Sequence, residues 1–217
     1  MTWIKICGIT RVEDALEAAS LGIDAVGFVF APGPRKVDPS IVREISQRLS
    51  NSVLRVGVFV NQDSSEVDQI ITECGLTALQ FHGDEPPEYC QRFFLPIIKA
   101  IRIKGLESLK EVERFPRATL LLDTFCPVKA GGTGVPFPWE IALKAKERRD
   151  IILSGGLNPG NVGAAIESVS PFGVDVSSGV ESMPGKKDLS KMVQFVKEVR
   201  KADKDVSSLA AKIGGEL

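Results

Sequence analysis

The sequence has few of the residues from which metal centres and disulfide scaffolds are built. Its 217 residues include one histidine and four cysteines, at positions 7, 74, 90 and 126. No two of these cysteines have the spacing of zinc ligands, and together they do not form a disulfide framework. We therefore expect no metal site, and unpaired thiols are typical of proteins from a reducing compartment.

Neither sign of charge dominates the chain, and long apolar runs are missing. Lysine and arginine number 27 and aspartate and glutamate 28, for a net charge of -1. Without a basic field we expect neither nucleic acid nor a membrane surface as a partner, so an anionic ligand would have to be held by local groups. No apolar run has the length of a bilayer span, and no signal or transit peptide pattern precedes the first apolar run. The expected location is cytoplasmic.

What the sequence does contain suits a globular protein with a large core. Hydrophobic residues make up 43% of the chain and charged residues 25%. No linker or change of composition divides it, so we expect one domain over residues 1–200. Residues 201–217 form a tail outside the repeating pattern. In this tail Val206, Leu209, Ala210 and Ile213 have the spacing of one helix face, which predicts a short extra helix docked on the domain. The alternative is a frayed polar end.

Short β-branched runs alternate with helical patterns along residues 1–200. Strands are expected at 3–6, 25–30, 54–60, 78–81, 97–101, 119–122, 151–153 and 173–176. Helices are expected at 11–21, from 38–39, from 63–64 to 74, at 106–114, from 137–138, at 160–169 and at 188–200. Eight strands that alternate with helices predict an α/β fold of the (β/α)8 or TIM barrel type. An open doubly wound sheet is the competing architecture, but no glycine-rich dinucleotide fingerprint follows the first strand.

In a barrel of this type the loops after the carboxyl ends of the strands build the active site. The first strand delivers Cys7 to that end, and Lys5 lies on the same face of the strand. A nearby ammonium favours the thiolate, which is the reactive form of a cysteine. The alternative is that Cys7 is a small buried hydrophobic residue, as most free cysteines are.

Small residues follow the last two expected strands. They let backbone amides approach an anion closely, and barrels often bind phosphate after strands seven and eight. We therefore predict a phosphate site there, with structural turns as the alternative; its residues are Gly155, Gly156, Ser177, Ser178 and Gly179. The run Gly131–Gly134 is less specific and could form a lid over the same ligand.

Three further side chains follow strands at the same end of the barrel. Asp123 ends an apolar strand and is either a capping or ion-pairing group or a functional acid, roughly across the barrel mouth from Cys7. Arg35 can clamp a carboxylate, although a surface arginine is the commoner case. His82 is expected mainly as a satisfied polar residue. Possible substrate contacts are His82, Gly132, Thr133, Gly134 and Asp175.

Seven segments carry a resemblance to a known family. They are KICGIT at 5–10, DAVGFVF at 24–30, VGVFV at 56–60, LQFHG at 79–83, LLDT at 121–124, SGGLNP at 154–159 and VDVSSGVE at 174–181. In order and spacing this set resembles the motifs of the phosphoribosylanthranilate isomerases, over about residues 3–200. The tail is not covered.

The resemblance implies an enzyme of tryptophan biosynthesis that works without metal or organic cofactor. Its sugar-phosphate substrate would be N-(5′-phosphoribosyl)anthranilate, which an Amadori rearrangement converts into 1-(2-carboxyphenylamino)-1-deoxyribulose 5-phosphate. The residue that matches the family's general base is Cys7, and Asp123 matches its general acid. Arg35 matches the arginine that contacts the anthranilate carboxylate, and the small residues after strands seven and eight match the phosphate site.

Two other functions compete with this one. The aminoaldose isomerase of histidine biosynthesis runs the same rearrangement in a sugar-phosphate barrel, but such barrels use two aspartates, whereas Cys7 ends the first strand here. A non-catalytic sensor of phosphoribosyl ligands would keep the phosphate site and lose the acid or the base, yet Cys7 and Asp123 are both present. Monomer and homodimer are both compatible with the sequence.

Overall fold

The protein is described from a computed structural model. The structure describes residues 1–124 and 138–214, the last eight of these as backbone only. Within these ranges the chain alternates between strands and helices in the order expected from the sequence.

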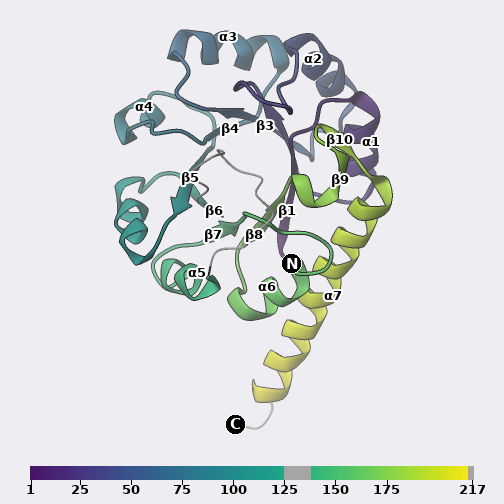
Figure 1. The fold of residues 1–217 in the computed structure, drawn as a ribbon, viewed down its shortest axis with the longest axis vertical. Coiled ribbons are helices and arrows are strands. Elements are labelled where there is room, and N and C mark those ends of the chain that lie inside the picture. The colour runs from purple at the N-terminus through teal and green to yellow at the C-terminus, as the bar shows by residue number, and fades with distance from the viewer. Residues whose placement is uncertain (125–137, 215–217) are drawn as a thin grey trace.

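Eight parallel strands close into a barrel, in the order β1 to β8 around the ring (Figure 1). Closure is made by β1, which pairs with β2 through Ile6 and Val26 and with β8 through Ile4 and Val174. The strands are β1 (Trp3–Cys7), β2 (Ala25–Val29), β3 (Leu54–Phe59), β4 (Ala78–Phe81), β5 (Ile97–Ile103), β6 (Thr119–Thr124), β7 (Ile151–Leu153) and β8 (Gly173–Val176). The predicted (β/α)8 barrel is confirmed.

Alternate residues of each strand face the inside of the barrel and the surrounding helices. The inner cluster takes one residue in two from the strands, and its buried members are Ala25, Val56, Ala78, Ile98, Ala100, Leu121 and Ile152. The outer cluster takes the residues between them, such as Ile4, Ile6 and Phe28. This two-residue period brings Cys7, Asp123 and Asp175 onto the inner face, because each follows inner-facing residues of its own strand at even spacing.

Helices surround the strands and cover the outer cluster (Figure 1). They are α1 (Val12–Ser20), α2 (Pro39–Arg48), α3 (Ser64–Cys74), α4 (Pro87–Gln91), the 3₁₀ helix η1 (Leu106–Arg114), α5 (Trp139–Lys146), α6 (Val162–Val169), the short 3₁₀ turn η2 (Ser178–Val180) and α7 (Leu189–Gly214). Two predicted starts are confirmed by their caps: Asp38 accepts from the amide of Ser40, and Asp63 from the amide of Ser65, each at 2.8 Å.

Besides α4, a short helix for which no range was predicted, two helices differ from expectation. The segment 106–114 forms a 3₁₀ helix because its apolar residues Leu106, Leu109 and Val112 recur every third position, which matches three residues per turn. The last helix, expected to end at 200, continues to Gly214, because no glycine or proline interrupts it before that residue. The tail is therefore helical as an extension of α7, and its docking remains a prediction.

A small hairpin between β8 and α7 was not predicted. It consists of β9 (Glu181–Met183) and β10 (Lys186–Lys187), two short antiparallel strands outside the barrel. Two of its charged residues, Glu181 and Lys187, are buried. A hairpin of this size has little core of its own, so its position depends on what these two side chains contact.

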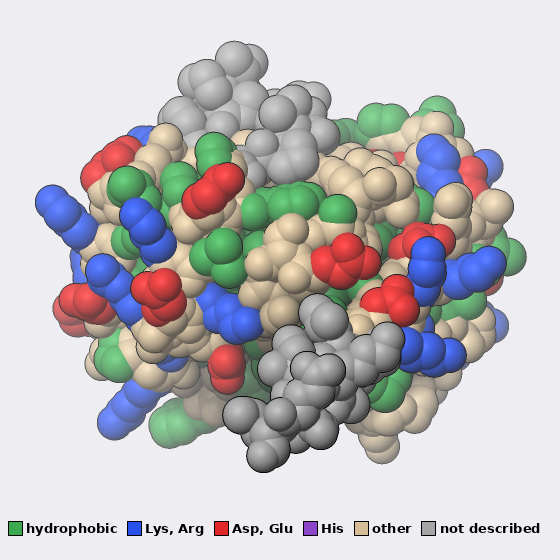
Figure 2. All heavy atoms as spheres, turned by 90° about the horizontal axis from the view of Figure 1, so that it is seen from below, with side chains coloured by type: hydrophobic (Ala, Val, Ile, Leu, Met, Phe, Trp, Pro, Cys, Tyr) green, Lys and Arg blue, Asp and Glu red, His purple; other side chains and the backbone are tan. Residues whose placement is uncertain are grey.

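The surface shows no field of one sign on the face seen in Figure 2, where basic and acidic side chains are interspersed around apolar patches. Among the residues that the structure describes, no helix combines the length and the apolar character needed to span a bilayer.

Candidate active site

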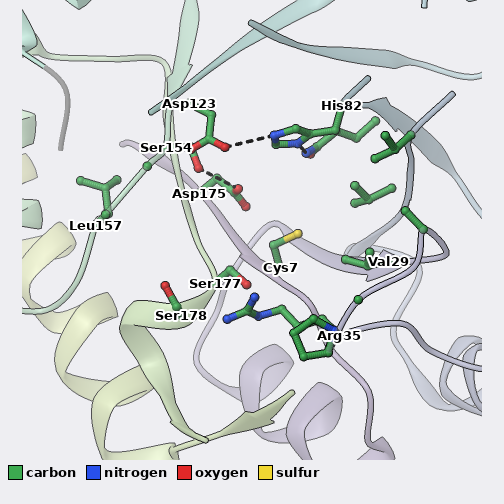
Figure 3. Close-up of a pocket in the computed structure, with 18 of the residues that line it drawn as sticks. Cys7, Val29, Arg35, His82, Asp123, Ser154, Leu157, Asp175, Ser177 and Ser178 are labelled. Atoms are coloured by element: carbon green, nitrogen blue, oxygen red, sulfur yellow. Dashed lines mark hydrogen bonds and ion pairs between the residues drawn. The ribbon is translucent and has the colours of Figure 1, made fainter. Parts of the chain in front are cut away.

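A cavity of about 260 Å³ opens at the carboxyl ends of the barrel strands (Figure 3). Its walls come from both the strands and the loops that follow them. The structure brings nine of the predicted residues into these walls, namely Cys7, Arg35, His82, Asp123, Gly155, Gly156, Asp175, Ser177 and Ser178. The fifth residue of the phosphate prediction, Gly179, is not among the residues that line the cavity but lies in the same β8 loop. There a Cβ would overlap the carbonyl oxygen of Leu157, so the absence of a side chain lets the β7 and β8 loops touch.

Cys7 ends β1 beside a buried ion pair. The Nζ of Lys5 lies 2.7 Å from Oδ1 of Asp175, and no part of the lysine is exposed to solvent. The second oxygen of Asp175 accepts a hydrogen bond from the hydroxyl of Ser154 at 3.1 Å. Both carboxylate oxygens of Asp175 therefore have partners. One partner is Lys5, the only cationic side chain on the inner face of β1.

Burial and the neighbouring charges together determine the charge state of Cys7. Burial raises the pKa of the Cys7 thiol, the charge of Lys5 lowers it, and Asp175 raises it again, with a net rise. Lys5 does lower the pKa of the Cys7 thiol, as expected from the sequence, but burial outweighs it and Asp175 adds to the rise. The thiol is therefore protonated at neutral pH until a further positive charge comes close.

Asp123 lies near the end of β6 and is almost fully buried, with 3% of its surface exposed. Its Oδ1 accepts from the backbone amide of Thr124 at 2.9 Å, and its Oδ2 lies 3.0 Å from Nε2 of His82. The other ring nitrogen of His82 lies 3.0 Å from Nε2 of Gln80. His82 is therefore a polar residue with a partner for each ring nitrogen, as expected, and one of these partners is the candidate acid, as the dashed line in Figure 3 shows.

Arg35 reaches the cavity from the loop after β2. Its Nε and Nη2 donate to the two carboxylate oxygens of Glu181 at 2.8 and 2.7 Å, in a bidentate pair. Burial would raise the pKa of Glu181, but the hydrogen bonds from Arg35 and the charge of Lys187 outweigh it and lower that pKa. A guanidinium has five N–H donors, so the pair with Glu181 leaves the end-on fork of Nη1 and Nη2 available on the cavity side.

Lys187 lies behind Cys7 and is completely buried. Its Nζ contacts three acceptors: the carbonyl oxygen of Cys7 at 2.6 Å, that of Ser177 at 3.1 Å and Oε1 of Glu181 at 3.0 Å. An ammonium has three donors, so each finds one acceptor. Lys187 and Glu181 together connect β1, the β8 loop and Arg35.

The loop after β7 has the backbone geometry of an anion site. Gly155 and Gly156 both have positive φ, at 82° and 76°, which side chains rarely adopt. Within the described residues neither of their amides donates a hydrogen bond to another group. Successive free amides at such a bend form a concave anion-binding surface. The β8 loop adds Ser177 and Ser178 to the same wall of the cavity.

Some predicted residues lie outside the described part of the chain. These are the run Gly131–Gly134, with its three possible substrate contacts Gly132, Thr133 and Gly134, and the fourth cysteine, Cys126. Among the described residues, no group of three histidine, cysteine, aspartate or glutamate side chains has the arrangement of a metal site.

Comparison with known proteins assigns the chain to a family. The family model described as N-(5'phosphoribosyl)anthranilate (PRA) isomerase matches residues 4–198. The chain belongs to this isomerase family. A curated relative, N-(5'-phosphoribosyl)anthranilate isomerase from Desulforudis audaxviator, is 52% identical over 205 residues, which cover 93% of this chain and 100% of the relative.

Solved structures of phosphoribosylanthranilate isomerases have the same fold. The structure of the Thermotoga maritima isomerase has a TM-score of 0.88 and 42% identity, and the match covers 93% of this chain and 100% of that one. A second structure is of an isomerase in complex with reduced 1-(o-carboxyphenylamino)-1-deoxyribulose 5-phosphate. It has a TM-score of 0.84 and 41% identity, with coverage of 93% and 100%.

Three side chains of this isomerase family member were not singled out from its sequence. Gln80 and Glu181 both lie within segments that carry the family resemblance, but no local sequence pattern indicates which residues they contact. Lys187 is one of several lysines near the C-terminus, and only its full burial distinguishes it. The alternation of β4 could have indicated Gln80, because a polar residue on an inner-facing position points into the barrel.

Proposed function

We propose that the chain isomerises N-(5′-phosphoribosyl)anthranilate to 1-(2-carboxyphenylamino)-1-deoxyribulose 5-phosphate, a step of tryptophan biosynthesis, with Cys7 as the base and Asp123 as the acid. The observation that carries this proposal is that a thiol and a buried carboxyl group line one cavity with an amide-rich loop and an arginine fork. The rearrangement moves hydrogen within one substrate, so it needs no external oxidant or organic cofactor.

The first step is opening of the aminofuranose ring. Asp123 gives a proton to the ring oxygen while the C–O bond breaks and the anilino nitrogen forms a Schiff base with C1′. The Schiff base is cationic, and a cation near Cys7 favours the thiolate over the thiol. In this scheme the base is formed when the substrate requires it, which fits a thiol whose pKa is raised by burial in the free protein.

The second step is proton removal from C2′. The Cys7 thiolate takes this proton, because the adjacent Schiff base makes it acidic, and the electron pair of the C–H bond forms the enolamine. Tautomerisation of the enolamine then gives the ketone. General acid and base catalysis each contribute about 10²–10⁴-fold to such steps.

The two ends of the substrate are held by separate groups. The phosphate binds the amides of Gly155 and Gly156 and the β8 loop, and the anthranilate carboxylate binds the end-on fork of Arg35. Glu181 holds that fork in place from the other side. Fixing both ends of the opened, flexible chain supplies much of the remaining reduction of the barrier.

The experiment follows the loss of anthranilate-type fluorescence after purified protein is mixed with phosphoribosylanthranilate generated in place. We expect rapid loss with the wild type and a kcat at least roughly a hundredfold lower for Cys7→Ala and for Asp123→Asn. Cys90→Ala is the matched control, since this buried thiol lies in α4 and outside the cavity walls.

The other outcomes select the rival functions. Near-wild-type turnover in Cys7→Ala would keep the isomerase and place the base elsewhere. No turnover by a folded, phosphate-binding protein would favour the sensor or another sugar phosphate, such as the aminoaldose of histidine biosynthesis. The cytoplasmic location and the choice between monomer and homodimer remain predictions.

A further inference from the structure

The only histidine of the chain lies between an amide and a carboxyl group on the inner face of the barrel. Nδ1 of His82 is 3.0 Å from Nε2 of Gln80, and Nε2 of His82 is 3.0 Å from Oδ2 of Asp123. The side-chain oxygen of Gln80, Oε1, is buried and has no hydrogen-bond partner among the residues that the structure describes. Gln80, His82 and Asp123, here called the relay, therefore form a line of polar groups with one acceptor unused.

Two hydrogen-bond patterns are compatible with this line, and they differ by one proton. In the first, the Gln80 amide donates to Nδ1, so the neutral ring carries its proton on Nε2 and donates it to an ionised Asp123. In the second, the Gln80 amide is turned over, Oε1 accepts from a protonated Nδ1, and His82 and Asp123 together hold one more proton. The unused Oε1 is the acceptor that the second pattern needs.

We propose that Gln80 and His82 are positioning residues for Asp123: they fix its carboxyl group and hold, together with it, the proton that it donates. Before ring opening the relay is in the second pattern. When the proton passes to the ring oxygen of the substrate, the relay returns to the first pattern, in which His82 stabilises the carboxylate that remains. The inference rests on the proposed function and adds two residues to its acid step.

The backbone around His82 keeps the ring in this line. Its amide donates to the carbonyl oxygen of Phe59 at 2.9 Å, and its own carbonyl oxygen accepts from Arg102 at 2.8 Å. The next residue, Gly83, donates to the buried carboxylate of Glu85 at 3.0 Å and accepts from Lys99 at 2.7 Å. Such fixed neighbours are what a positioning residue needs, because a small displacement of a catalytic group costs about a hundredfold in rate.

The charged and titratable groups around the ring come from several elements. Asp123 on β6 is in contact with it, and the backbone of His82 binds Arg102 of β5. Other ionisable side chains in the walls of the same cavity are Cys7 on β1, Arg35 in the loop after β2 and Asp175 on β8. Asp175 is neutralised by Lys5 at 2.7 Å, so Asp123 is the carboxylate that determines the proton on Nε2.

The first test is a spectroscopic one that does not depend on activity. Since the chain has one histidine, ¹⁵N labelling of histidine in protein without a histidine tag gives the ring signals of His82 alone. In the first pattern the ring is a single tautomer with the proton on Nε2, and this is the signal that we expect from the neutral ring. Asp123→Asn should relax this preference, and Gln80→Met should change the Nδ1 signal. A ring with mixed tautomers that neither variant changes would overturn the proposal.

The second test is kinetic and uses His82→Gln and Gln80→Met. The glutamine at 82 keeps an amide donor for Asp123 but holds no additional proton, and methionine at 80 keeps the volume without polar atoms. We expect kcat to fall about tenfold to a hundredfold in both, with KM within about threefold of wild type. Gln47→Met, an exposed residue of α2, is the matched control.

The outcomes separate this inference from the proposed function. An inactive wild-type protein would contradict the proposed function, whatever the ring signals show. An active wild type that loses turnover in Asp123→Asn, but keeps both kcat and its pH profile in His82→Gln and Gln80→Met, would contradict the relay alone. A shared loss of kcat with a shift in the alkaline limb of the pH profile, where the acid loses its proton, supports it, because a purely structural role would lower stability without moving that limb.

Discussion

The ammonium of Lys187 lies 2.6 Å from the backbone carbonyl oxygen of Cys7, 180 residues away in the chain. The same Nζ contacts the carbonyl oxygen of Ser177 in the β8 loop. The β9–β10 hairpin, which lies outside the barrel, is in this way connected to the candidate base and to the phosphate loop at once. By donating to both carbonyl oxygens, this buried lysine holds the end of β1 and the β8 loop next to each other.

Replacing this lysine tests that connection. In Lys187→Met the two carbonyl oxygens and one oxygen of Glu181 lose a donor inside the protein. Removing one partner of a buried ion pair costs about 3–5 kcal/mol, so we expect the free energy of unfolding in urea to fall by that order. Lys186→Met is the control, because Lys186 precedes Lys187 on β10 and its side chain is exposed. Equal stability of the two variants would contradict a supporting role for Lys187.

Glu181 is expected to act on substrate affinity through Arg35. In Glu181→Gln the amide nitrogen replaces one of the two oxygens that the guanidinium grips, so the fork loses its bidentate partner. We predict a KM raised about tenfold with a smaller change in kcat, since the carboxylate contact exists in both ground and transition states. The measurement is steady-state fluorescence kinetics, with the exposed Glu44→Gln as control. An unchanged KM would mean that Arg35 keeps its orientation without Glu181.

The fold was predictable because local patterns and tertiary packing agree. The two-residue period of the strands and the caps at Asp38 and Asp63 are visible in the sequence, and the structure confirms them. The two differences arise from local detail: a three-residue apolar period in η1, and the absence of a helix breaker that lets α7 continue to Gly214. The β9–β10 hairpin escaped prediction because it is held by buried charges and not by an apolar pattern.

The site was predictable only in its position. The rule that active sites form at the carboxyl ends of barrel strands places Cys7, Asp123 and the two glycines in one cavity, and the structure agrees. The charge state of Cys7 was not predictable, because it depends on burial of the thiol and on Asp175, which is 170 residues from the Lys5 with which it pairs. The contacts of Glu181 with Arg35 and of Lys187 with Cys7 also join residues that are far apart in the sequence, so no local pattern indicates them.

The raised pKa of Cys7 predicts how activity depends on pH. Burial, followed by the charge of Asp175, raises this pKa, whereas Lys5 and Lys187 lower it. Because the base is the thiolate, kcat/KM for the free enzyme should increase by about tenfold per pH unit between about pH 7 and 9. Activity increases with pH because only the deprotonated thiol acts as a base, and a raised pKa means that this form becomes common only at higher pH.

Asp175→Asn and Lys5→Met should shift the rise of kcat/KM with pH, here called the rising limb, in opposite directions. The first removes a negative charge near Cys7 and frees Lys5 to pair with the thiolate, so the limb moves to lower pH. The second removes a positive charge, so the limb moves to higher pH. The rate of alkylation of Cys7, followed by peptide mass spectrometry across the same pH range, reports the thiolate without any substrate. Shifts of the same sign in both variants would contradict this account.

Gly27 on β2 provides the space that Cys7 occupies. A Cβ at this position would lie 2.7 Å from Sγ of Cys7, closer than real Cβ contacts allow, and 3.1 Å from Cε of Lys5, which is tight. In Gly27→Ala the thiol must therefore move, and we expect kcat to fall at least about tenfold, together with a loss of about 1–3 kcal/mol in the free energy of unfolding. Gly163→Ala is the matched control, since a Cβ there meets nothing within 4 Å and alanine is the better helix former. If Gly27→Ala kept wild-type turnover, the position of the thiol would not limit the reaction, and the assignment of Cys7 as the base would fail with it.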